Sequence, residues 1–250
     1  DAHAGYALAQ SGYTDAIIIS FGAGGNDGVT NVFHANSSGI HRIKRFPVNF
    51  GDAYLQMCYP ISEIRGMKME NESVGHLPND TDMCKQLEEL AEEGEVIDNW
   101  VDSLSRYYIS YVYADAPDMD DFVDFKYKGN RRDMGESLGL DLSINALKGE
   151  QSRNFAATNQ KVFEQIFIGL ISPLLDAYNH LPLILTGGCA LNKHLPLLIR
   201  ENKAYAEEGK LFIPKDPTNS TLSVGQLNYL APSRSQYTEV SKIHHVSKSQ

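Results

Sequence analysis

The chain has 250 residues, of which 42% are hydrophobic, and its 22 lysine and arginine residues stand against 32 aspartate and glutamate residues. The resulting net charge of −10 argues against a broad nucleic-acid surface, which needs a basic patch. No apolar run approaches the length of a membrane span, and no signal peptide is visible. The three cysteines, Cys58, Cys84 and Cys189, are odd in number and widely spaced. This pattern predicts reduced thiols in a cytoplasmic protein.

The chain opens with a helix, and a buried strand follows. Residues 1–13 have helical spacing and carry His3, although a lone histidine is more often structural than a metal ligand. Residues 15–20, DAIIIS, are rich in isoleucine, which favours a buried strand. Two more strands, joined by a tight turn, are expected at 29–33 and 40–43.

A glycine-rich stretch, FGAGGNDG at residues 21–28, joins the first of these strands to the second. Glycine lets a backbone turn tightly and come close to a ligand, so Gly24 and Gly25 are candidates to face a phosphate. A plain β-hairpin explains the same residues without a ligand.

The middle of the chain is less informative. Asp52 is expected to cap a helix that begins near residue 50. Residues 83–97 are acidic and helical in composition, which predicts a solvated face, whereas 101–112 has the apolar spacing of a packed helix. The aspartates of residues 115–124 lack the glycine and the closing glutamate of a calcium loop, which favours a solvated loop.

A long amphipathic helix is expected from Asn154, because apolar residues recur there every three or four positions. Pro173 and Asn179 mark its end. Gln160 and Glu164 lie one turn apart on this helix, where they face a ligand or form a solvated polar stripe. A last strand is expected at 211–214, and the polar residues from Ser233 predict a loose tail.

The most informative stretch is LPLILTGGCALNKHL at residues 181–195. An apolar run bounded by proline and by Gly187-Gly188 predicts a buried parallel strand, with a helix after the turn. A strand, a glycine turn and a helix N-terminus together make a site for phosphate or another anion. Asn192 favours this interpretation, since an amide just past such a turn can bond a ribose or a phosphate. An ordinary strand-to-helix turn explains the same shape.

Four segments, in order along the chain, resemble the O-carbamoyltransferases of antibiotic and nodulation-factor biosynthesis. TGGCALN resembles their GG-x-ALN signature, DAHAGYALAQSGY their HxxxHA segment, FAATNQKVFEQ their A-A-x-x-Q-x-x-x-E helix, and FGAGGNDG their phosphate-facing hairpin. That family has a Kae1-like domain of the actin/sugar-kinase/Hsp70-like superfamily. The resemblance implies an α/β fold of two RNase H-like lobes, the first incomplete at its N-terminus. Residues 1–150 would be the rest of the first lobe plus a variable insertion, 151–232 the second lobe with the nucleotide loop, and 233–250 a polar tail.

The resemblance also implies an enzyme that moves a carbamoyl group from carbamoyl-adenylate to a hydroxyl of a small-molecule acceptor. ATP is the source of the adenylate, which a YrdC-like partner domain makes in the family, and no motif of that domain occurs in these residues. The nucleotide would lie against Gly187, Gly188 and Asn192, with Gly24 and Gly25 approaching from the other side.

A divalent metal, iron or a similar ion, is the second cofactor that the resemblance implies, as a Lewis acid on the carbamoyl group. His3 matches the second histidine of the family's ligand set. The third ligand position falls on Gly22, which has no side chain, and the fourth on Asn219, a neutral residue in place of aspartate. We therefore expect a divalent metal to bind poorly or not at all.

Three functions stay open at the level of sequence. The first is a working carbamoyltransferase with an altered site. The second is a non-catalytic nucleotide-binding relative that lost the metal. The third is an ATP-dependent phosphotransferase of the same superfamily.

Overall fold

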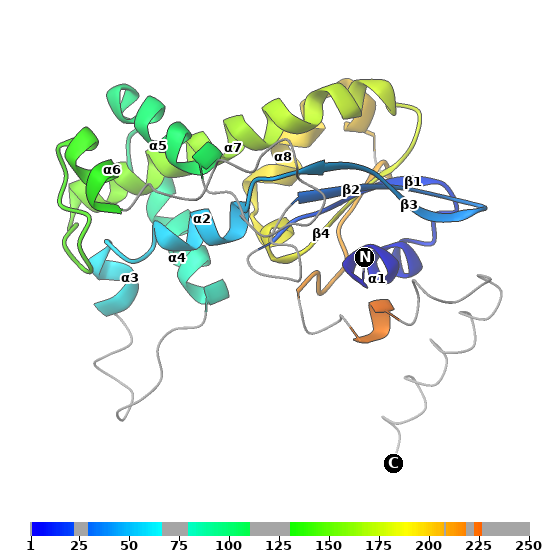
Figure 1. The fold of residues 1–250 in the computed structure, drawn as a ribbon, viewed down its shortest axis with the longest axis horizontal. Helices are drawn as coiled ribbons and strands as arrows, with labels where there is room; N and C mark the ends of the chain where they lie inside the picture. Colours follow the sequence, from blue (N-terminus) through cyan, green and yellow to red (C-terminus); the bar gives the residue numbers. More distant parts are fainter. Residues whose placement is uncertain are drawn as a thin grey trace, which may run out of the picture.

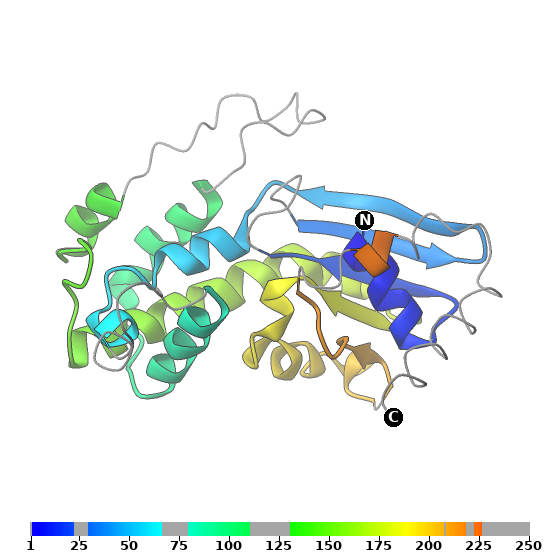
Figure 2. The same ribbon diagram turned by 90° about the horizontal axis from the view of Figure 1, so that it is seen from below.

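The computed structural model describes residues 2–22, 30–66, 80–110, 131–207, 209–218 and 223–226. They form a mixed α/β structure around one five-stranded sheet (Figure 1). The sheet lies at one end of the molecule and a group of helices at the other (Figure 2). The 28-residue helix α7 (Glu150–Ala177) connects the two ends.

The strand order of the sheet is β3-β2-β1-β4-β5. The central strand β1 (Ala16–Ser20) pairs antiparallel with β2 (Thr30–Asn36), which pairs antiparallel with β3 (Gly39–Phe46). On its other side β1 pairs parallel with β4 (Leu183–Thr186), and β4 pairs parallel with the short β5 (Leu211–Phe212). All five predicted strands are therefore present, the last one shortened to two residues.

The expected division of the chain at residue 150 does not separate two sheets. β1 belongs to the expected first segment and β4 to the second, yet Ile17 to Ser20 pair with Leu183 to Thr186 in one sheet. Both strands are buried along their whole length. Apolar runs of this kind are stable at the centre of a sheet whose two faces are both covered.

Different helices cover the two faces of the sheet. Successive side chains of a strand point to opposite faces, so Ile18 packs under α1 (Ala2–Ser11) while Ile17 and Ile19 pack under α7. The face under α7 holds the larger core. α7 continues through Pro173 and ends at Ala177, between the two predicted end signals.

The helical end of the molecule is built on the first half of α7. It contains α2 (Phe50–Gln56), α3 (Ser62–Gly66), α4 (Asp80–Glu92), α5 (Asp98–Ser110) and α6 (Arg131–Leu138). α4 and α5 pack directly against α7. Leu104 and Tyr108 are fully buried, which confirms the packed helix predicted at 101–112 as far as Ser110, the last described residue of that range. Across the described ranges, no helix combines the length and the apolar character that crossing a membrane requires.

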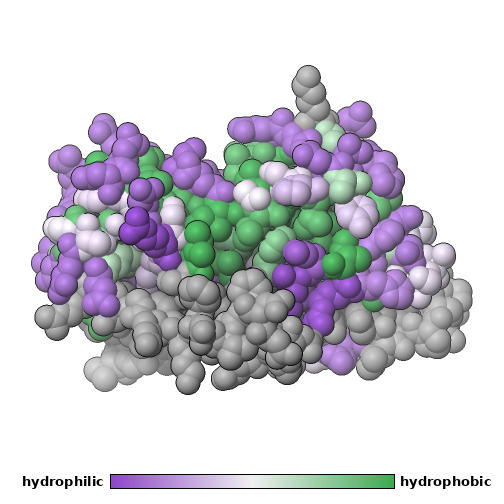
Figure 3. Space-filling view, turned by 45° about the horizontal axis from the view of Figure 1, so that its top comes forward, coloured by the Kyte–Doolittle hydropathy of each residue, from purple (hydrophilic) through white to green (hydrophobic). Residues whose placement is uncertain are grey.

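Part of the apolar stripe of α7 is only half-buried. Figure 3, in which the top of Figure 1 comes forward, shows a band of hydrophobic residues across the middle of this face, between hydrophilic shoulders. The half-buried apolar residues of α7 are Ile166, Ile168, Leu170 and Leu174. They lie beside the fully buried Phe167 and Ile171, so the apolar stripe of α7 is wider than its covered part.

Two helix starts differ from the expectation. The cap of α2 is Asn49, whose Oδ1 accepts a hydrogen bond from Asp52 N–H at 3.1 Å, and Asp52 lies inside the first turn. Asn49 Nδ2 returns a bond of 2.6 Å to the Asp52 carboxylate, a reciprocal arrangement like a capping box. After β4, the chain forms a 3-10 turn, η2 (Gly188–Leu191), and the α-helix α8 (His194–Arg200) begins only after it. The glycine turn therefore leads into a 3-10 helix and not into the expected α-helix N-terminus.

Candidate functional site

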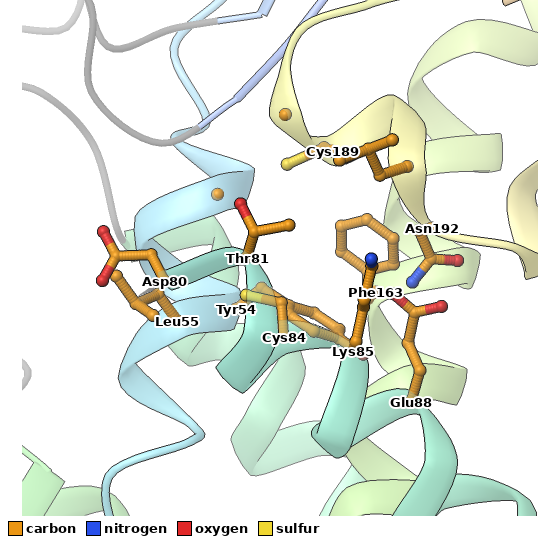
Figure 4. A pocket seen from close by; sticks show the side chains of 13 residues that line it. Tyr54, Leu55, Asp80, Thr81, Cys84, Lys85, Glu88, Phe163, Cys189 and Asn192 are labelled. Carbon is orange, nitrogen blue, oxygen red and sulfur yellow. The ribbon is translucent and has the colours of Figure 1, made fainter. Parts of the chain in front are cut away.

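A pocket opens where the chain after β4 meets α2, α4 and α7. Its empty space, counted together with the part open to solvent, is about 570 Å³. Figure 4 shows Tyr54 of α2, Cys84 and Glu88 of α4, Phe163 of α7 and Asn192 around it. These residues are far apart in the sequence, and the fold brings them together at the carboxyl end of β4.

The two glycines of the loop meet different surroundings. Gly187 has a φ of 92°, in the left-handed region that favours glycine, and a Cβ there would overlap the Phe21 carbonyl. Gly187 is thus required by the close approach of the loop to the chain after β1. Gly188 lines the pocket, and nothing lies within 4 Å of the position that its Cβ would take. Of this pair, Gly188 is the residue beside space that a ligand can occupy.

Asn192 holds the far end of the loop against α7. Asn192 Nδ2 donates to Gln160 Oε1 at 3.1 Å, and Gln160 Nε2 donates to Asn192 Oδ1 at 3.2 Å. Tyr54 Oη also donates to Gln160 Oε1, at 2.7 Å. Gln160 is 4% exposed and Asn192 is 5% exposed, so the alternative of a solvated polar stripe is wrong for Gln160. The network fixes α2, α7 and the loop relative to one another.

The polar network continues from Gln160 to the start of α8. Gln160 Nε2 donates to Glu164 Oε1 at 2.8 Å, and His194 Nδ1 lies 3.7 Å from the same oxygen. His194 N–H donates to Asn192 Oδ1 at 3.1 Å. Both hydrogens of the Gln160 amide and the Oδ1 of Asn192 therefore have protein partners. Asn192 Nδ2 donates one of its two hydrogens to Gln160, and the second hydrogen can be donated to a ligand.

α4 places a buried carboxyl group in the pocket. Glu88 is 6% exposed, and its Oε2 accepts a hydrogen bond from Lys193 N–H at 3.1 Å. Burial raises the pKa of Glu88, and the Lys193 N–H bond opposes this rise. The solvated face predicted for 83–97 is wrong at this position. The apolar side of α4 packs on α7. Met83 and Leu87 are buried for this reason, and Glu88 is buried because it lies at the edge of the same side.

The three cysteines lie close together at the pocket. Cys84 and Cys189 line it (Figure 4), and Cys58 forms a side-chain contact with Cys84. Burial raises the pKa of Cys58 and of Cys189, and the hydrogen bond with Cys84 adds to the effect at Cys58. Thiols with raised pKa values stay neutral and react slowly. All three are free, in agreement with the prediction from their number and spacing.

The structure brings together only some of the predicted site residues. Gly188 and Asn192 share the pocket, and Gly22 lies against the loop, since a Cβ on Gly22 would stand 3.1 Å from Gly188 N. His3 lies on α1, across the sheet from α7 and the pocket. Gly24, Gly25 and Asn219 fall outside the described residues, so their predicted roles stay predictions.

The expected metal ligands do not assemble within the described ranges. No three histidine, cysteine, aspartate or glutamate side chains there come together in a way that could hold a metal ion. Gly22 approaches the loop but has no donor atom. His3 and Gly22 alone do not make a metal site within the described residues, and Asn219 lies outside them.

Apart from Gly188 and Asn192, the sequence reasoning missed the residues of the pocket, among them Tyr54, Cys84 and Glu88. For Glu88 a signal existed, because Met83 and Leu87 lie one turn apart on the same helix and place Glu88 at the edge of their apolar stripe. Tyr54 carries no such signal. Its partner Gln160 is 106 positions away, and only the tertiary fold joins them.

Comparison with known proteins does not identify the chain. It matches no protein-family model, and no curated protein matches it. The functional argument therefore depends on the geometry of the pocket and on the motifs that line it.

Proposed function

We propose that this chain binds an adenine nucleotide in the pocket and moves a carbamoyl group from carbamoyl-adenylate to a hydroxyl of a small-molecule acceptor. The observation that carries this proposal is the shared position of Gly188 and Asn192, two residues of the GG-x-ALN motif, on one pocket. That pocket lies at the carboxyl end of β4, where open α/β sheets bind their ligands. The reaction itself comes from the family resemblance.

The sheet supports an RNase H-like lobe in this proposal. Its order β3-β2-β1-β4-β5, with an antiparallel β2 and parallel β1, β4 and β5, is the arrangement expected for such a lobe. A Cβ on Gly225 would overlap the Ala2 carbonyl, so the last described segment packs on the start of α1, where the resemblance expects His3 to act.

The lining of the pocket suits the nucleoside part of the ligand. Phe163 and Leu55 offer apolar surface to a base, and Asn192 offers an amide. Asp80 and Glu88 also line the pocket, against the single cation Lys85 among its described lining. Whether or not Glu88 carries a proton, this lining offers no surplus of positive charge to hold a phosphate. We therefore assign the phosphates to the glycine-rich stretch that contains Gly24 and Gly25.

The remaining parts of the proposal come from the resemblance alone. A YrdC-like domain would make the adenylate from ATP and carbamoyl phosphate. His3 and Asn219 are the candidate metal ligands. A non-catalytic nucleotide-binding relative is the second candidate function, and Gly22 favours it, because the family has a carboxylate ligand at that position.

Calorimetric titration with AMP tests the site. The parent chain should bind AMP, and Gly188→Asp should abolish binding, since it brings both a side chain and a negative charge into the pocket. Gly188→Ala should fold like the parent, because its Cβ meets no neighbour within 4 Å.

Unchanged AMP affinity in Gly188→Asp would refute the pocket as the nucleotide site. If AMP binds as expected, carbamoyl transfer is measured with a YrdC-like domain, ATP, carbamoyl phosphate and a panel of hydroxyl acceptors. Binding of AMP without transfer to any acceptor would favour the non-catalytic relative.

A further inference from the structure

Glu88 is a buried carboxyl group in the wall of the pocket. Glu88 lies beside Asn192 and near the ring of Phe163 (Figure 4). A base stacked on the apolar wall of the pocket would present its polar edge to such neighbours. Burying a carboxyl group is costly without hydrogen-bonding partners, and Lys193 N–H supplies one partner, to Oε2. A ligand in the pocket would lie directly against this group.

The charges around Glu88 are mixed. On α4 itself lie Lys85 and Glu92, and the loop contributes Lys193, whose Nζ pairs with Glu92 Oε1 at 2.7 Å. α2 contributes the buried phenol of Tyr54, and η2 the thiol of Cys189, both of which interact with Glu88. On α7, Gln160 is neutral and Glu164 is bonded to it. Burial raises the pKa of the Glu88 carboxyl group, and the Lys193 N–H bond and the charges of Lys193 and Lys85 oppose this rise without cancelling it. The carboxyl group therefore takes up a proton more readily than an exposed glutamate.

A protonated carboxyl group presents a donor and an acceptor side by side. The edge of adenine presents the matching pair, with N1 as acceptor and the N6 amino group as donor. A charged carboxylate has only acceptors, and one of its oxygens would face the lone pair of N1. The protonated form is therefore the one that pairs with adenine.

We propose that Glu88 selects the adenine base, sharing one proton with adenine N1 and accepting a hydrogen bond from the N6 amino group. This inference rests on the proposed nucleotide site. The inference specifies that the adenine base is the part of the ligand that fills the pocket and that Glu88 is the residue that recognises it.

The test is calorimetric titration with adenosine between about pH 5.5 and about pH 8. Adenosine is the probe because it has no phosphate group that titrates in this range. The protonated fraction of Glu88 falls as pH rises, so the affinity of the parent for adenosine should fall as pH rises. Purine riboside, which lacks the amino group, should bind about tenfold more weakly than adenosine, as expected for one lost hydrogen bond.

Variants at Glu88 separate the shared proton from a simple charge effect. Glu88→Gln keeps a donor and an acceptor at every pH, and its Oε1 can still accept from Lys193 N–H. Its adenosine affinity should stay at or above that of the parent at the high end of the range and should not depend on pH. Glu88→Ala should weaken binding by about tenfold or more. Glu89→Gln, an exposed neighbour on the same helix, is the matched control and should behave as the parent, including its pH dependence.

Two results would overturn this inference alone. Equal losses in Glu88→Gln and Glu88→Ala would mean that the charged carboxylate binds the ligand, for instance through ribose hydroxyls. Unchanged affinity in Glu88→Ala, with a melting temperature near that of the parent, would mean that Glu88 does not touch the base. Absence of adenosine and AMP binding in the parent, or AMP binding that survives Gly188→Asp, would overturn the proposed site together with it.

Discussion

Gly187 and Gly188 are adjacent, but the space around them differs. A side chain at Gly187 would need the left-handed φ of 92° and would overlap the Phe21 carbonyl, whereas a side chain at Gly188 would stand in the open pocket. Backbone strain of this kind costs about 1–3 kcal/mol, and a steric overlap adds to it. The pair therefore separates a structural glycine from a ligand-facing one.

Urea denaturation measures this difference. Gly187→Ala should lower the free energy of unfolding by about 2 kcal/mol or more. Gly188→Ala should change it by less than about 0.5 kcal/mol. Equal losses in the two variants would contradict the distinction between the glycines.

The sequence predicted the residues of the loop better than the residues opposite it. Gly187, Gly188 and Asn192 stand together in one motif, and a strand followed by a glycine turn has a recognisable pattern. The acidic composition of residues 83–97 predicted a solvated face that includes Glu88. Composition is an average over a helix and does not show which single residue is buried. Its burial depends on which side of α4 meets α7, and that contact is a tertiary property.

At the scale of elements, the start of α7 depends on a side chain from another helix. Its N-cap is Gly149, which has no side chain to cap with. Glu63 of α3 accepts hydrogen bonds from Gly149 N–H and, at 2.8 Å, from Ser152 Oγ. Partial burial raises the pKa of Glu63, but these bonds outweigh it, and the pKa is lowered overall. Negative charge at a helix N-terminus is also stabilising.

Removing this charge should destabilise the fold in a pH-dependent way. Because the folded pKa of Glu63 is lowered, its contribution is present above the ordinary glutamate pKa and is lost as pH falls through the lowered value. Glu63→Gln should therefore cost about 1 kcal/mol at neutral pH, and the difference from the parent should vanish in acid.

Urea denaturation of both proteins across the acid range provides the measurement. Glu93→Gln, at an exposed position, is the control and should match the parent throughout. A difference between Glu63→Gln and the parent that stays constant with pH would assign the effect to packing and not to charge.

The strands and the long helix were predictable because their signals are local. β1 and β4 are short apolar runs bounded by glycine or proline, and α7 repeats its apolar residues every three or four positions. The 3-10 turn after Gly187 was not predictable in the same way. The close approach of the loop to Phe21, which follows the neighbouring strand β1, determines the backbone conformation there. The spacing of apolar residues in the sequence does not indicate this contact.

At the scale of the whole molecule, local sequence patterns could not predict the order of the strands in the sheet. β1 and β4 are separated by more than 160 positions and still lie side by side. The expected division at residue 150 comes from the family resemblance, and the order of motifs along a chain does not record strand pairing. The pocket depends on the same long-range pairing, since β4 brings the loop to the helices that close the site.

Thiol footprinting tests the central claim, that the pocket is the nucleotide site, most directly. Cys84 is half-buried and lines the pocket, while Cys58 is fully buried beside it. The measurement is the rate of Cys84 alkylation by iodoacetamide, followed by mass spectrometry, with and without AMP at a concentration that saturates the calorimetric titration. We predict that AMP slows alkylation of Cys84 several-fold and that Gly188→Asp abolishes this protection. Alkylation of Cys84 at the same rate with and without saturating AMP would show that the nucleotide binds elsewhere and would contradict the account.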